Sequence, residues 1–99
     1  MKVRLTKELK KAVEHCVWFE PAEQAVQDIA RLAAYVLTYG TPEDTYALRD
    51  QIDTETLIEC LDKAPPGIYD ERSWAYWNLV AGRYNPPPMP ERIFPEPGI

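Results

Sequence analysis

The sequence has few of the residues that carry catalysis and ligand binding in small proteins. It holds one histidine, two cysteines and four glycines. It contains no HExxH pattern, no EF-hand loop, no zinc-ligand spacing and no glycine-rich phosphate loop of the GxGxxG or GxxxxGKS type. The absence of these patterns predicts a protein with no catalytic residues, no bound metal and no cofactor.

The single histidine, His15, stands next to Cys16. Successive residues of a helix point about 100° apart, so local spacing does not make this pair a nucleophile and its base. Cys60 could approach His15 in space, although nothing in the sequence requires it. We therefore expect His15 at the surface and the two cysteines as small buried groups.

Two cysteines without a CxxC pair are too few for the disulfide framework of a small secreted domain. The opening stretch, MKVRLTKELKK, is basic but lacks the apolar region of a secretory signal. No apolar run reaches the roughly 18 residues that a membrane span needs. These features predict a cytoplasmic protein with no membrane partner.

The charge of the chain is distributed unevenly. Residues 1–11 have five bases and one acid, which gives +4, whereas residues 12–81 have 13 acids and four bases, which gives −9; residues 82–99 balance. An acidic body repels a phosphate backbone, so we expect no nucleic-acid partner. The carboxylates between residues 43 and 62 indicate a solvated acidic face: Glu43, Asp44, Asp50, Asp53, Glu55, Glu59 and Asp62.

Apolar residues recur at spacings of three and four, which predicts an all-α fold, a single-domain bundle of about five helices. These helices should span about residues 7–19, 21–39, 42–50, 54–63 and 71–81, and the second is apolar enough to be central. Thr41, Asp53 and Asp70 are expected to cap the last three helices. Gly40 and Gly82 should end helices in the left-handed conformation.

Proline dominates the C-terminus, where six of the ten prolines follow residue 85. We predict a helical domain over residues 1–84 and an extended, proline-rich tail over residues 85–99 that packs on or flanks the domain. Met89, Ile93 and Phe94 are spaced to cover the last helix.

That last helix is crowded with aromatic side chains. Trp74 and Trp77 share one side, Tyr76 and Tyr84 lie in a second row, and Asn78 is the main position left for water. One interpretation is that the core buries one side and the tail covers the other. The alternative is a protein-binding surface, for which the candidates are Trp74, Tyr76, Trp77, Tyr84, Met89 and Phe94. An aromatic face left open would favour a homodimer.

Several segments resemble a group of small bacterial proteins of unknown function. Residues 36–44, VLTYGTPED, are similar to an RVLxxGxxED segment of that group, and residues 73–82, SWAYWNLVAG, are similar to its FWxLxLG segment. The VWFE and LDKA stretches resemble its tryptophan motif and its LxxA helix ending, so the resemblance covers residues 17–82. It departs at the Pro65–Pro66–Gly67 break and in the tail. Genes of this group often lie beside abortive-infection toxins of the nucleotidyltransferase type, so the resemblance implies an antitoxin-like or accessory role without catalytic residues.

Together these features predict a non-enzymatic protein-interaction module, with a toxin enzyme as one candidate partner. An acidic body could occlude a basic nucleotide-binding cleft. Two alternatives stay open. One is a small-molecule-binding domain or enzyme with a pocket between the aromatic helix and the tail. The other is a transcriptional accessory domain, although the helix at 54–63 would have to enter a DNA groove while carrying three acids and one base.

Overall fold

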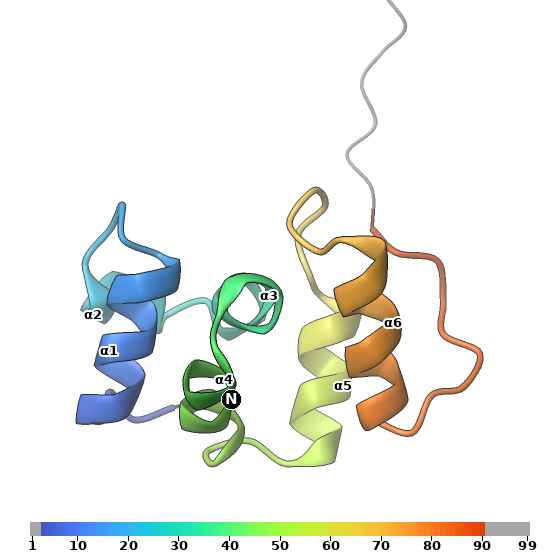
Figure 1. Cartoon of the computed structure of the whole chain (residues 1–99), viewed down its shortest axis with the longest axis horizontal. Coiled ribbons are helices and arrows are strands. Elements are labelled where there is room, and N and C mark those ends of the chain that lie inside the picture. Colours follow the sequence, from blue (N-terminus) through green and yellow to red (C-terminus); the bar gives the residue numbers. More distant parts are fainter. Residues whose placement is uncertain (1–2, 91–99) are drawn as a thin grey trace, which may run out of the picture.

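Six α-helices joined by short connections form the fold of the computed structural model, which describes residues 3–90 (Figure 1). They are α1 (Lys7–Cys16), α2 (Ala22–Ala25), α3 (Ile29–Tyr39), α4 (Pro42–Arg49), α5 (Thr54–Asp62) and α6 (Glu71–Val80). No strand occurs between residues 3 and 90, so the all-α prediction is confirmed. Within the same range, every helix is too short or too polar to cross a membrane.

The central element is α3, as its apolar sequence predicted. In Figure 1 it lies between the α1–α2 pair and the α5–α6 pair, and it packs against each of the other five helices. Its buried side chains are mostly small, which lets neighbouring helices approach closely. They are Ile29, Ala30, Leu32, Ala33, Ala34, Val36 and Leu37.

The predicted helix over residues 21–39 was wrong in one respect, because it is two helices. The backbone N–H groups of Gln27 and Asp28 bond to carbonyls only three residues back, which tightens the chain into a turn. The Asp28 side chain then accepts a hydrogen bond from the backbone N–H of Arg31 at 3.1 Å and caps α3. The N-cap aspartate thus divides one expected helix into two, although the apolar pattern continues across the break, and the fold has six helices rather than five.

The first helix also ends earlier than expected, at Cys16 rather than at Phe19. Val17 leaves helical geometry (φ −128°, ψ 56°), and its backbone N–H closes the last turn by donating to the Val13 carbonyl. The chain must become extended before Pro21, so the helix cannot continue to that point. Trp18 and Phe19 consequently lie in an exposed turn.

Each of the three predicted N-caps is confirmed. The side-chain oxygens of the caps accept from the backbone N–H three residues later at 3.2 Å for Thr41, 2.7 Å for Asp53 and 2.7 Å for Asp70. At Thr41 the pairing is reciprocal, because the Asp44 carboxylate accepts the Thr41 backbone N–H at 3.0 Å. This capping box fixes the start of α4.

Only one of the two glycine predictions is correct. Gly82 has φ 84°, the left-handed conformation expected just after a helix. Gly40 has φ −76°, so it does not end α3 in that way. Position 40 needs a glycine for lack of space, because a Cβ there would lie 2.5 Å from the Val36 carbonyl oxygen.

The aromatic helix α6 turns both of its tryptophans inward. Trp74 and Trp77 are 6% and 8% exposed, and the Trp77 indole N–H donates to the Leu37 carbonyl of α3 at 2.8 Å. The prediction that Asn78 faces water was wrong. Its side chain is fully buried, and its amide donates to the Trp74 carbonyl at 2.8 Å. Beyond the first turn, the exposed positions of α6 are instead Ala75, Tyr76 and Leu79.

After α6 the chain returns along that helix without regular structure. The Trp74 indole N–H donates to the Pro87 carbonyl at 3.0 Å, and the half-buried Met89 packs against the core. This part of the tail covers one tryptophan. Tyr84 is exposed, so nothing in residues 3–90 covers the second aromatic row. Ile93 and Phe94 lie outside the described residues.

Removing residues 86–90 should make Trp74 accessible to a quencher in water, because its hydrogen bond to Pro87 is lost. We compare chains ending at Pro90 and at Asn85, both carrying Trp18→Phe because Trp18 is 78% exposed and would dominate the signal. Iodide should quench the shorter chain more strongly. Equal quenching in two chains with the same circular dichroism would contradict this role of the tail.

Candidate functional site

The five described residues of the predicted interaction surface do not form one exposed face. Trp74 and Trp77 are buried, Tyr76 and Tyr84 are 57% and 78% exposed, Met89 is half-buried and Phe94 lies outside the described residues. A tryptophan that holds the core together does not serve as an exposed binding anchor. Three other features remain: a pocket, an aromatic strip and a cluster of titratable side chains.

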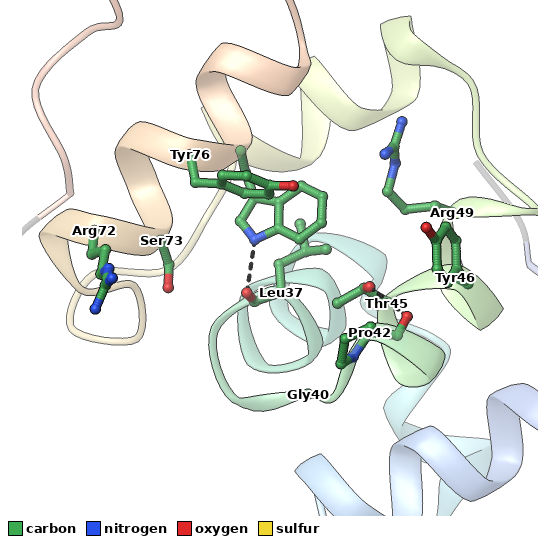
Figure 2. A pocket seen from close by; sticks show the side chains of 10 residues that line it. Leu37, Gly40, Pro42, Thr45, Tyr46, Arg49, Arg72, Ser73 and Tyr76 are labelled. Carbon is green, nitrogen blue, oxygen red and sulfur yellow. Dashed lines mark hydrogen bonds between the residues drawn. The ribbon is translucent and has the colours of Figure 1, made fainter.

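The pocket has a volume of about 410 Å³ and lies between α4 and α6, over the end of α3 (Figure 2). We call it the α4–α6 pocket. Its lining residues are Leu37, Gly40, Pro42, Thr45, Tyr46, Arg49, Arg72, Ser73, Tyr76 and Trp77. Buried Leu37 and Trp77 form an apolar base, whereas Tyr46 and Tyr76 are 67% and 57% exposed. No tail residue up to Pro90 lines it, so this pocket lies between the aromatic helix and α4 and is not the one expected between the aromatic helix and the tail.

The charge of the α4–α6 pocket is opposite to that of the chain. Two arginines line it and no carboxylate does, although residues 12–81 have a net charge of −9. Figure 2 shows Arg49 and Arg72 at opposite sides of the pocket. Neither forms an ion pair within residues 3–90. The pocket therefore offers two guanidinium groups to an anionic group.

Local packing fixes one of the two arginines. The Arg49 guanidinium carbon lies 5.7 Å from the centre of the Trp77 ring, within range of a cation–π interaction. Its Nε is buried and has no hydrogen-bond partner among the described residues. The Trp77 ring also meets Tyr76 edge to face at 4.9 Å between centroids. These contacts order the pocket before any ligand binds.

The second feature is an aromatic strip that starts in the α1–α2 turn and continues on α3. Its rings contact one another in sequence at 5.5–6.3 Å between centroids: Trp18, Phe19, Tyr35 and Tyr39. The Arg31 guanidinium carbon lies 5.6 Å from the Phe19 ring and 5.4 Å from the Tyr35 ring. Arg31 is also paired with Glu20, so its charge is already compensated. At one end of the strip, Trp18 lines a pocket of about 460 Å³ together with Glu14, Glu20 and Glu23, so this pocket is acidic rather than basic.

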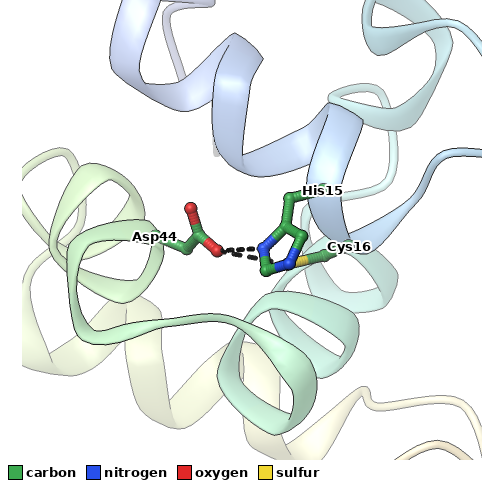
Figure 3. Close-up of side chains that lie close together, drawn as sticks. All are labelled: His15, Cys16 and Asp44. Atoms are coloured by element: carbon green, nitrogen blue, oxygen red, sulfur yellow. Dashed lines mark hydrogen bonds and ion pairs between the residues drawn. The ribbon is translucent and has the colours of Figure 1, made fainter.

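The third feature joins the end of α1 to the start of α4 (Figure 3). His15 Nδ1 lies 2.6 Å from Asp44 Oδ2, and Cys16 Sγ lies 3.8 Å from the same oxygen. We call these three residues the His15–Cys16–Asp44 cluster. The side chains of His15 and Cys16 point in different directions from α1, but the Asp44 carboxylate lies between them and contacts both. Asp44 is thus an exception to the predicted solvated acidic face, because it is only 9% exposed.

Burial and hydrogen bonding shift the pKa values in this cluster in opposite directions. Burial raises the pKa of the Cys16 thiol to about 12, and the charge of Asp44 adds to the rise. Burial alone would also raise the pKa of the Asp44 carboxyl, but hydrogen bonds from His15 and Thr41 outweigh it and lower that pKa. At neutral pH the cluster therefore holds a thiol and a carboxylate, so Cys16 is not a thiolate nucleophile.

Comparison with protein-family models, with curated proteins and with solved structures found no match to this chain. The function must therefore be argued from the three features above.

Sequence reasoning found only part of these features. It singled out Tyr76 and Trp77 of the α4–α6 pocket but missed the contribution of α4. One side of α4 carries three of the lining residues, because their spacings along the helix are one and three: Thr45, Tyr46 and Arg49. That spacing was a usable signal. The cluster had no such signal, since it depends on how α1 packs against α4.

Proposed function

We propose that this protein is a non-enzymatic interaction module that binds a partner protein through the α4–α6 pocket. The observation that supports this most directly is a pair of arginines that have no ion-pair partner within residues 3–90 and that lie beside exposed tyrosines. Tyrosine, tryptophan and arginine are the residues most enriched at the energetic centres of protein interfaces. The pocket places tyrosine and arginine side chains around an apolar base to which Trp77 belongs.

The chemistry of the pocket indicates what part of a partner it would hold. An acidic side chain could bridge to Arg49 or Arg72, while a neighbouring apolar side chain contacts Leu37 and Trp77. The exposed carboxylates of α5 would repel a partner that is acidic as a whole. The proposed partner therefore has a basic surface overall and presents one carboxylate as an anchor.

A narrower form of the proposal is an antitoxin-like partner of a nucleotidyltransferase-type toxin. It is supported by the resemblance of residues 17–82 to proteins encoded beside such toxins, and by the acidic surface. A nucleotide-binding cleft is basic, so the exposed carboxylates Glu55, Glu59 and Asp62 of α5 would complement it.

Arg72→Ala and Tyr76→Ala should each weaken partner capture by about 30-fold, the loss expected for an interface hot spot of about 2 kcal/mol. Both side chains are exposed, so the fold should be unaffected. The measurement is a quantitative pull-down from native lysate, and from cells that co-express the product of the neighbouring gene. Tyr84→Ala is the matched control, because Tyr84 is also an exposed tyrosine but lies outside the pocket.

Two outcomes would contradict the proposal. If Trp18→Ala abolishes capture while the pocket variants retain it, the aromatic strip is the binding surface. If no protein is captured, but small carboxylates or phosphates raise the melting temperature of the wild type and not of Arg72→Ala, the pocket binds a small molecule. Small-molecule binding is the second candidate function, and the pocket volume of about 410 Å³ favours it, because that volume lies in the range of small-ligand sites.

A further inference from the structure

The His15–Cys16–Asp44 cluster gathers three metal-binding atoms of three chemical types. A ring nitrogen of His15, Cys16 Sγ and a carboxylate oxygen of Asp44 all lie within 4.8 Å of one another. Imidazole nitrogen, thiolate sulfur and carboxylate oxygen are the usual protein ligands of zinc. In residues 3–90 this is the one group of three such side chains so close together.

The spacing of these atoms is near that of a tetrahedral site. With zinc–ligand bonds of about 2.0–2.3 Å, neighbouring ligand atoms lie roughly 3.3–3.6 Å apart. The observed 3.8 Å between Cys16 Sγ and Asp44 Oδ2 is close to this range. The 2.6 Å between His15 Nδ1 and the same oxygen must widen by less than about 1 Å. The His15 side chain is 57% exposed, so it can rotate by that amount.

Two of the three ligands are already held in place by their surroundings. Cys16 and Asp44 are 7% and 9% exposed, and the Asp44 carboxylate is fixed by the Thr41 backbone N–H. The backbone of Gly40 lies directly against both, since a Cβ there would be 3.4 Å from Cys16 Sγ and 2.9 Å from Asp44 Cβ. A site with two fixed ligands and one mobile exposed ligand can close around an incoming ion.

We propose that His15, Cys16 and Asp44 form a binding site for a divalent transition-metal cation of the zinc type. The ion takes Sγ, Nδ1 and one carboxylate oxygen, and water occupies the fourth position on the exposed side of His15. On binding, the Cys16 S–H bond breaks and its proton leaves to solvent as the metal–sulfur bond forms. His15 coordinates as a neutral imidazole with its proton on Nε2, and no electron is transferred.

Cobalt(II) replaces zinc in such sites and reports on its ligands by absorption. The full chain, purified with a chelator and then freed of it, should bind one equivalent of Co²⁺. The complex should show a thiolate-to-cobalt charge-transfer band and the visible bands of tetrahedral Co²⁺, both removed by added Zn²⁺. Cys16→Ser should abolish the charge-transfer band. Cys60→Ser is the matched control, because Cys60 is also buried but is not part of the cluster, and it should keep the band.

His15→Ala tests the same site without disturbing the core. The side chain is exposed, so the variant should fold. Loss of a residue that only supports a metal ligand lowers metal affinity by roughly 10- to 100-fold, and loss of the ligand His15 should lower the Co²⁺ affinity by at least as much. Three results would overturn the proposal: no band at millimolar Co²⁺ with native circular dichroism, a band lost in Cys60→Ser but kept in Cys16→Ser, or an affinity unchanged in His15→Ala. In each case the cluster is a hydrogen-bonded contact between helices only.

Discussion

Trp77→Ala is expected to lower the free energy of unfolding by about 3–5 kcal/mol, the range for removing a large aromatic side chain from a packed core. Trp77 is 8% exposed and joins α6 to α3 through its hydrogen bond to the Leu37 carbonyl. Its ring also supports Arg49 and the base of the α4–α6 pocket. The measurement is urea unfolding followed by circular dichroism. A loss below about 1 kcal/mol would mean that α6 contributes little to the core.

Two further variants separate the parts of this effect. Trp77→Phe keeps most of the apolar volume but removes the indole N–H, and should lower stability by about 1–3 kcal/mol because a buried carbonyl loses its donor. It also keeps the test informative if Trp77→Ala fails to fold. Tyr76→Ala changes a 57% exposed neighbour on the same helix, and should stay within about 0.5 kcal/mol of the wild type.

Features that depend on a few adjacent residues were predictable from the sequence. Thr41, Asp53 and Asp70 cap helices as expected, because a capping side chain bonds to a backbone N–H only three residues away. Gly82 was also predictable, because it immediately follows a helix. The all-α class follows from periodicity, which is likewise local.

Features that depend on packing between helices were not predictable. A helical wheel shows that Asn78 differs from its apolar neighbours, but not that other elements cover that side of α6 and leave Tyr76 in water. Asp44 appeared as one carboxylate among many on an acidic face. Only the approach of α1 to α4 buries it against His15 and Cys16.

The same reasoning explains why the break at Asp28 was missed although its signal was present. Periodicity extended across the turn, since Ala25 and Ile29 are both buried and lie four residues apart. A continuous apolar stripe therefore outweighed a single N-cap residue. In the structure the N-cap determines where α3 begins, because the Asp28 side chain accepts a hydrogen bond from an N–H group at the start of that helix.

Asp44→Ala should lower the free energy of unfolding by about 2–4 kcal/mol at neutral pH. The side chain completes the capping box of α4, whose loss costs about 1 kcal/mol, and accepts a charge-assisted hydrogen bond from His15, worth about 1.5–3 kcal/mol. Both losses fall where α1 meets α4. Glu43→Ala, at the exposed neighbouring position, is the control and should change stability by at most about 1 kcal/mol. A chelator keeps any bound metal from contributing.

The pH dependence of this effect separates its charge from its packing. Because the folded state lowers the pKa of the Asp44 carboxyl below its usual value of 3.8, its ionisation stabilises the fold above that pH. This contribution disappears as the pH falls through the lower pKa of the folded protein. The stability difference between wild type and Asp44→Asn should therefore shrink as the pH falls from about 5 towards about 3. A difference that stays constant from about pH 5 down to about pH 3 would mean that Asp44 stabilises the protein by shape and hydrogen bonding alone, without its charge.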